Sequence, residues 1–364
     1  MLKHKIGIIT QILAERPGAI EVEVEIDGEK SKAIAYTSLV ASPEVGDRTA
    51  LNTTAVSLGL GTGGLHFIIE NLSREADVLN DGPGHIMKLR YTPEQHAVLS
   101  VEEEDSPHRS LIDSFQSLNK MPVIIGQLHS QVAPAAAAIK RLTQPKAKIA
   151  YIMTDSAALS IAFSRIVSQM KETGLLDVTI TAGQAFGGDI EAVNVYSALI
   201  AAKTVSNADV AIVCQGPGNV GTGTKYGFSG IEQGEIVNAA AMLGGTPIAI
   251  PRISFADPRP RHRGMSHHTI TSLSEVALAQ AIVPLPMMEE MKLLAVEEQI
   301  RQTSINYKHR TRVIDGMPGI RECAERGIKL STMGRGFNED PEFFLAAAAA
   351  GVLAAEFIRS TGSM

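Results

Sequence analysis

Residues 256–269, ADPRPRHRGMSHHT, concentrate cationic side chains in a chain that is otherwise acidic and largely apolar. Guanidinium groups bind carboxylates and phosphates through paired donors, which predicts an anion site. Imidazoles transfer protons near neutral pH or bind metal ions. The residues concerned are Arg259, Arg261, Arg263, His262, His267 and His268.

Two prolines, each following a charged residue, restrict this segment to an extended path and disfavour a helix. The adjacent pair His267-His268 lacks the i, i+4 spacing of a helical zinc motif, so a divalent metal ion needs further ligands. The partners expected from elsewhere in the chain are His129, Asp155 and Asp189.

A second unusual segment, GPGNVGTGT, covers residues 216–224 and matches the pattern GxGxxG. The glycine-rich residues after it do not open the helix that a dinucleotide site requires. Lys225 and Tyr226 do not fit the end of a Walker A motif. The segment therefore indicates either a plain turn or an anion-binding loop, to which we assign Gly216, Gly218, Gly221, Thr222, Gly223 and Thr224.

The positions of these segments follow from a predicted α/β domain. Short apolar runs alternate with helical patterns, which favours a doubly wound, mostly parallel sheet covered by helices on both faces. The runs are 122–128, 148–154, 178–183, 208–214, 246–254 and 281–286, with helices near 130–144, 157–173, 188–206 and 232–244. Ligands bind beyond the carboxyl ends of such strands, where all the candidate residues fall.

The chain before this domain has a different pattern. Polar and apolar residues alternate on both sides of Asp27-Gly28, which predicts a β-hairpin. We expect a small antiparallel, barrel-like β-domain over 1–72, a bridging segment over 73–120, and the α/β domain with a helical C-terminal extension over 121–364. Lys88 is expected where the β-domain meets the larger one, in a packing role.

Composition excludes several classes of protein. A net charge of −6, 4% aromatic residues and the absence of Trp argue against nucleic-acid binding. Two distant cysteines fit a reducing cytoplasm. The N-terminus lacks the pattern of a signal peptide, and the apolar run 343–355 is too short for a membrane span, so we expect no membrane association.

Several motifs together resemble an uncharacterised bacterial family with a domain of unknown function. They are NTTAVSLGLGTGG, GHIMKLRYTP, GQLHSQVAP, TAGQAFGGDIEAVNVY, GPGNVGTGT and RISFADPRPRHRGMSHHT. The resemblance spans nearly the whole chain. It implies a bacterial, cytoplasmic setting and carries no activity, substrate or cofactor.

The leading hypothesis is an enzyme, a hydrolase or transferase, that acts on a small anionic ligand with histidine and arginine side chains, in one version with a metal ion. Asp155, Asp189 or Asp257 would assist the histidines. One alternative is a non-catalytic module that binds a nucleotide or metabolite, and another is a homo-oligomer whose arginine loop crosses a subunit interface. The arginines and histidines would have no binding role if the loop is simply a solvated surface.

Overall fold

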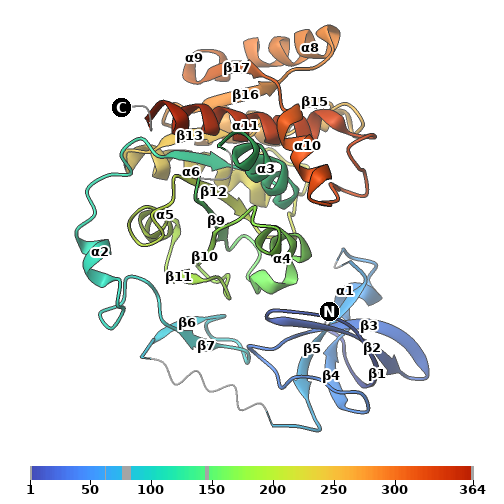
Figure 1. The fold of residues 1–364 in the computed structure, drawn as a ribbon. Helices are drawn as coiled ribbons and strands as arrows, with labels where there is room; N and C mark the ends of the chain where they lie inside the picture. The colour runs from blue at the N-terminus through green and yellow to red at the C-terminus, as the bar shows by residue number, and fades with distance from the viewer. Residues whose placement is uncertain (1, 62, 76–82, 144–146, 362–364) are drawn as a thin grey trace.

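The computed structural model describes residues 2–61, 63–75, 83–143 and 147–361. It contains a closed five-stranded barrel followed by an α/β domain with an eight-stranded parallel sheet, so the predicted fold class is confirmed. Figure 1 shows the barrel at one end of the α/β domain, with a small hairpin beside it. Residues 76–82 of the predicted bridging segment lie outside the described residues.

The barrel is a set of hairpins closed into the order β1-β2-β3-β5-β4. Neighbouring strands are antiparallel except β3 and β5, which run parallel. Asp27 and Gly28 both have positive φ angles, 55° and 82°, as the tight turn between β2 and β3 requires. The elements are β1 (His4–Arg16), β2 (Ala19–Ile26), β3 (Glu29–Tyr36), β4 (Arg48–Asn52), α1 (Thr54–Ser57) and β5 (Leu65–Asn71).

The bridging segment is anchored to the α/β domain by a buried lysine. The hairpin of β6 (Ile86–Lys88) and β7 (His96–Val98) precedes α2 (Arg109–Asp113). Lys88 is fully buried, and its Nζ donates to the carbonyls of Gly183 and Ala185 at 2.8 and 2.9 Å. Its Nζ lies 3.0 Å from the Glu191 carboxylate. These partners replace water around the charge.

The parallel sheet has the order β11-β10-β9-β12-β8-β13-β16-β17. Six strands agree in position with the predicted apolar runs, whereas β11 and β17 fall where we expected helix. β11 is only three residues long and four of the five residues of β17 are exposed, so neither produces an apolar run. The strands are β8 (Pro122–Ile125), β9 (Ile149–Thr154), β10 (Val178–Ala182), β11 (Ile190–Ala192), β12 (Val210–Gln215), β13 (Thr246–Ala249), β16 (Ile282–Pro286) and β17 (Arg310–Ile314).

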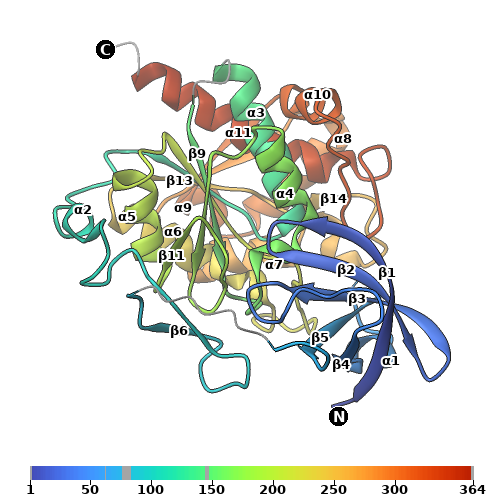
Figure 2. The ribbon, with the colours of Figure 1, turned by 60° about the horizontal axis from the view of Figure 1, so that its bottom comes forward.

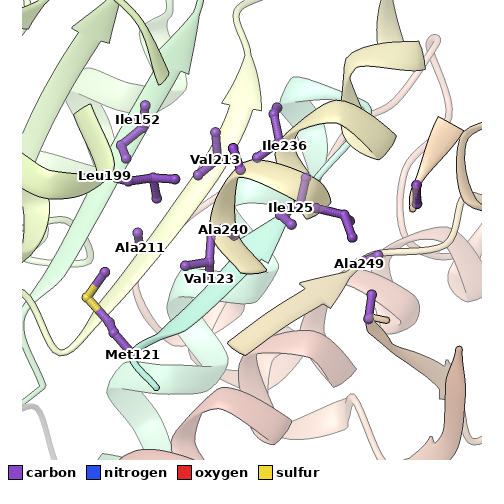
Figure 3. Close-up of a cluster of buried hydrophobic side chains, with 14 of the residues drawn as sticks. Met121, Val123, Ile125, Ile152, Leu199, Ala211, Val213, Ile236, Ala240 and Ala249 are labelled. Carbon is purple, nitrogen blue, oxygen red and sulfur yellow. The ribbon is translucent and has the colours of Figure 1, made fainter. Parts of the chain in front are cut away.

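Helices cover both faces of the sheet, and each face has its own apolar core. Figure 3 shows part of one core, where Leu199 of α5 and Ile236 of α6 lie over Ile152 and Val213 of the sheet. Residues 157–164, expected as helix, instead form an irregular segment ahead of α4. The main helices are α3 (Val132–Thr143), α4 (Arg165–Glu172), α5 (Val195–Thr204), α6 (Glu232–Met242), α8 (Glu290–Arg301), α9 (Ile305–Lys308), α10 (Met317–Glu325) and α11 (Pro341–Thr361).

The sheet has a point where the connections change face. β8 and β12 are neighbours, yet the helix after β8, α3, packs on one face and the helix after β12, α6, packs on the other. Such a point opens a crevice at the carboxyl ends of the strands. The segments that follow β8, β12 and β13 meet there.

The apolar C-terminal helix packs inside the protein. α11 is the single candidate membrane span in the described part of the chain, and 72% of its apolar window is buried. Gly351 allows its close approach to α3, because a Cβ there would lie 2.1 Å from the Ala135 carbonyl oxygen. The helix is therefore longer than the apolar run 343–355 that we judged too short for a membrane span, and the structure packs it against α3.

The barrel contacts the segment between β9 and α4 (Figures 1 and 2). Arg16 at the end of β1 donates from Nε to the Ala162 carbonyl at 2.8 Å and pairs with Glu21 at 2.7 Å. Arg165 at the start of α4 also pairs with Glu21. One buried carboxylate therefore joins the two parts of the chain.

Candidate functional site

The arginine and histidine segment is the loop of a short hairpin. β14 (Ile253–Ser254) pairs with β15 (Gly264–Met265), so residues 255–263 form a closed loop beyond β13. Gly264 has a φ of 73°, and a Cβ there would lie 2.5 Å from Gln299 Oε1. The expected extended path is only partly present, because Pro260–His262 form a turn of 3-10 helix and the chain enters α7 (His267–Thr271) directly after the hairpin.

This hairpin brings His262 back onto His267 and His268. One ligand nitrogen from each residue lies within 4.8 Å of the others. The ring centroids of His267 and His268 are 4.3 Å apart, and His262 lies 5.0 and 4.9 Å from them. Two nitrogens bound to one tetrahedral zinc ion are about 3.4 Å apart. Side-chain rotations that move each nitrogen by about 1 Å would therefore bring the three histidines to the distances that a bound metal ion requires.

The three histidines are neutral at physiological pH. Burial, with the nearby arginines adding to it, lowers the pKa of His262 to about 3. Burial and the neighbouring histidines lower the pKa of His268 to about 3, and burial with Arg261 lowers that of His267. Neutral imidazoles carry the lone pairs that a metal ion needs.

Hydrogen bonding leaves one ring nitrogen conspicuously unused. His267 Nε2 is buried and has no hydrogen-bond partner among the described residues. His262 Nδ1 lies 2.7 Å from Ser266 Oγ, the N-cap of α7, which also accepts from the His268 amide at 3.2 Å. When His262 donates from Nδ1, its Nε2 lone pair is available to a ligand.

The glycine loop after β12 covers one side of the histidines. Phe228 stacks on His268 with ring centroids 3.9 Å apart and planes 6° from parallel. A Cβ on Gly221 would lie 3.3 Å from His268 Cε1. Arg261 is exposed, and its guanidinium carbon lies 3.6 Å from the position of a Cβ on Gly223. The 216–224 and 256–269 segments therefore pack against each other.

The anion-binding residues predicted in these segments differ in availability. The hydroxyls of Thr222 and Thr224 form a hydrogen bond of 2.8 Å with each other at the exposed tip of the loop. Gly216 is buried, whereas Gly218, Gly221 and Arg263 are exposed. Arg259 is engaged, since its Nε and an Nη donate to the two Asp257 oxygens at 2.9 and 2.8 Å.

Asp257 is buried and serves as the counter-ion of several arginines. The hydrogen bonds from Arg259, which outweigh burial, hold its pKa well below the usual range. Arg252, also buried, donates to Asp257 at 3.1 Å, and Arg335 lies 3.8 Å away. Burial lowers the Arg252 pKa to about 10, so its guanidinium stays charged. Arg261 adds a cation beside the histidines.

The structure does not bring His129 to this cluster. Its Nδ1 lies 3.0 Å from the Tyr151 hydroxyl and its Nε2 lies 2.6 Å from Ser164 Oγ. Burial lowers its pKa to about 4. Both ring nitrogens are therefore used in joining α4 to the sheet, because the ring turns toward the face of the sheet that carries α3 and α4.

Asp155 and Asp189 also lie apart from the histidines. Asp155 accepts from the Gln184 amide at 2.9 Å and lines a separate hollow with Glu232. Asp189 accepts from the Thr179 amide and hydroxyl at 2.8 and 2.9 Å. The third nitrogen that lies near His267 and His268 comes instead from His262, because the hairpin folds the loop back on itself.

Sequence reasoning overlooked two residues that orient the cluster. Ser266 carried a usable signal, since serine before a short helix is a common N-cap. Phe228 carried no signal, because its stacking on His268 depends on how the glycine loop folds over the histidines.

Comparison with known proteins identifies a family without an assigned activity. No curated protein matches the chain. The family model described as "Protein of unknown function (DUF3866)" matches residues 32–351, which include the site and most of both domains. The chain therefore belongs to the DUF3866 family, as its motifs suggested.

Proposed function

We propose that this protein is a hydrolase that cleaves a small ester bearing a phosphate or carboxylate group, with a divalent metal ion held by His262, His267 and His268. The observation that carries the proposal is the convergence of three neutral imidazoles beside an exposed arginine, with one buried nitrogen that has no hydrogen-bond partner in the described part of the chain. Three histidines and one open position are a common ligand set of catalytic zinc.

The bound metal would supply Lewis acidity and activate water. The chain's own residues do the rest: Ser266 orients His262, Phe228 holds the His268 ring, and Arg261, which lies beside Gly223, binds the anion. Water adds to the phosphorus or carbonyl carbon, the ester bond breaks, and a proton passes to the leaving oxygen.

The charges around the cluster favour a metal ion together with an anion. Arg252, Arg259 and Arg335 surround Asp257, and Arg335 also pairs with Asp340 at 3.1 Å. These five residues leave one positive charge in excess, to which Arg261 adds another. A divalent cation is disfavoured in such surroundings unless a negative ligand accompanies it.

Metal content is the first test. Purified protein should contain about one zinc, manganese or other divalent metal ion per chain, as inductively coupled plasma mass spectrometry measures. His267→Ala and His268→Ala should lose it, whereas His4→Ala, at an exposed barrel position, should retain it. Unchanged metal content in the two cluster variants, or failure of the wild type to take up any divalent ion on reconstitution, would overturn the proposal.

Turnover is the second test, with p-nitrophenyl phosphate, bis(p-nitrophenyl) phosphate and a p-nitrophenyl monoester of succinate. Activity should disappear with a chelator and return with metal. Arg261→Ala should raise KM about 10-fold or more with metal content unchanged, since hydrogen bonds to charged groups contribute about 1.5–3 kcal/mol. A metal-loaded protein that binds these anions without hydrolysing them would instead support a non-catalytic binding module.

A further inference from the structure

An apolar pocket of about 470 Å³ lies between the barrel and the α/β domain. Its size falls within the range of small-molecule sites. Aromatic and aliphatic side chains form most of its wall, among them Tyr36, Phe67, Leu89, Leu159, Phe163 and Phe186. Burial raises the pKa of Tyr36, in agreement with a poorly solvated wall.

Two parts of the chain build the pocket together. Tyr36 and Phe67 come from strands β3 and β5 of the barrel, whereas Phe163 and Phe186 follow β9 and β10 at the carboxyl edge of the sheet. The rings form a connected series, with Tyr36 6.3 Å from Phe67 and 6.4 Å from Phe186, and Phe67 6.1 Å from Phe163. Without the barrel the pocket would lack one side.

The same loop that lines the pocket also covers the histidine cluster. Gly218 lines the pocket, and Gly221 packs against His268. Three residues of extended chain span at most about 11 Å. Gly218 and Gly221 are therefore at most about 11 Å apart, a distance comparable with the length of a ligand that carries both a ring system and an anionic group.

We propose that this pocket binds the aromatic body of the substrate whose anionic end is held at the histidine cluster, so that the substrate class is an aryl phosphate or an aryl monoester of a dicarboxylic acid. This inference rests on the proposed function. Aromatic rings pack favourably edge-to-face or offset against other aromatic rings, and four such rings line the pocket. The barrel then has a direct role as one wall of the substrate site.

The test compares 1-naphthylmethylphosphonate, whose carbon–phosphorus bond a hydrolase of esters cannot cleave, with inorganic phosphate and 2-naphthol in calorimetric titrations of the metal-loaded protein. The naphthyl phosphonate should bind about tenfold or more tightly than phosphate, because its ring system leaves water. Ala158→Trp places a large side chain at an exposed position on the pocket wall, and Leu159→Trp is an independent second plug. Ala324→Trp, at an exposed position of α10, is the matched control.

Both plugged variants should bind the naphthyl phosphonate no more tightly than phosphate, with phosphate affinity and metal content unchanged. The control variant should keep the full preference. Equal affinity of the wild type for the naphthyl phosphonate and for phosphate, or a preference that survives both plugs, would overturn the inference. A protein without metal that still binds 2-naphthol in the pocket would show failure of the proposed function alone. A metal-loaded protein that ignores 2-naphthol would show failure of the pocket inference alone.

Discussion

Ser266→Ala separates the proposed metal site from an ordinary packed histidine cluster. Ser266 is fully buried, and its Oγ contacts His262 Nδ1 at 2.7 Å while it caps α7. Loss of a hydrogen bond that orients a metal-ligating histidine typically lowers metal affinity 10–100-fold. This change corresponds to about 1.4–2.7 kcal/mol of binding free energy. Loss of the cap costs a further ~1 kcal/mol of folding stability.

The chain contains a matched control for this substitution. Ser164 is also buried, caps α4 by accepting from the Val167 amide, and lies 2.6 Å from His129 Nε2. Ser164→Ala removes the same kinds of hydrogen bond at a histidine that stands apart from the cluster. It should reduce the free energy of unfolding about as much as Ser266→Ala does, by roughly 1–2 kcal/mol, and leave metal affinity unchanged.

The assay is a competition for zinc between the protein and a chromophoric chelator, accompanied by urea unfolding of the metal-free proteins. Ser266→Ala should shift the competition curve by one to two decades relative to the wild type, and Ser164→Ala should coincide with the wild type. Equal zinc affinities in all three proteins, or equal losses in both variants, would refute the assignment of His262 as an oriented ligand.

Two further predictions concern how the parts of the chain are joined. Burial tends to raise the pKa of Glu21, but hydrogen bonds from Arg165 and Arg16 outweigh burial and lower the pKa below 4.5. The ionised carboxylate therefore adds to the free energy of unfolding above pH 4.5, and this contribution is lost as the pH falls through the lowered pKa. Glu21→Gln should lower the free energy of unfolding by about 3 kcal/mol at pH 7 and by much less at pH 3, as urea denaturation at both pH values measures; an equal loss at both would contradict the ion pair. Lys88→Met leaves buried carbonyls and the Glu191 carboxylate without their cation and should cost about 3–5 kcal/mol, with faster amide exchange in residues 83–98; a loss under 1 kcal/mol would show that the anchor is unimportant.

Local sequence patterns were sufficient to predict much of the fold. The alternation around Asp27-Gly28 specifies a hairpin because side chains alternate between the faces of a strand, and glycine adopts the positive φ angle that the turn requires. Apolar runs separated by helical lengths specify a parallel sheet, because parallel strands need long crossover connections. Strands β11 and β17 escaped this reasoning because short or exposed edge strands carry no apolar run.

The candidate site, like the fold, could be predicted only in part. The sequence itself shows arginine and histidine concentrated in residues 256–269, and their place after a predicted strand puts them at the carboxyl edge of the sheet. Which side chains converge depended on contacts between segments distant in sequence. The pairing of β14 with β15 places His262 next to His267. Hydrogen bonds to Tyr151 and Ser164 hold His129 on the face of the sheet that carries α3 and α4. Side-chain direction at such positions is set by packing partners, and no residue type or spacing encodes it locally.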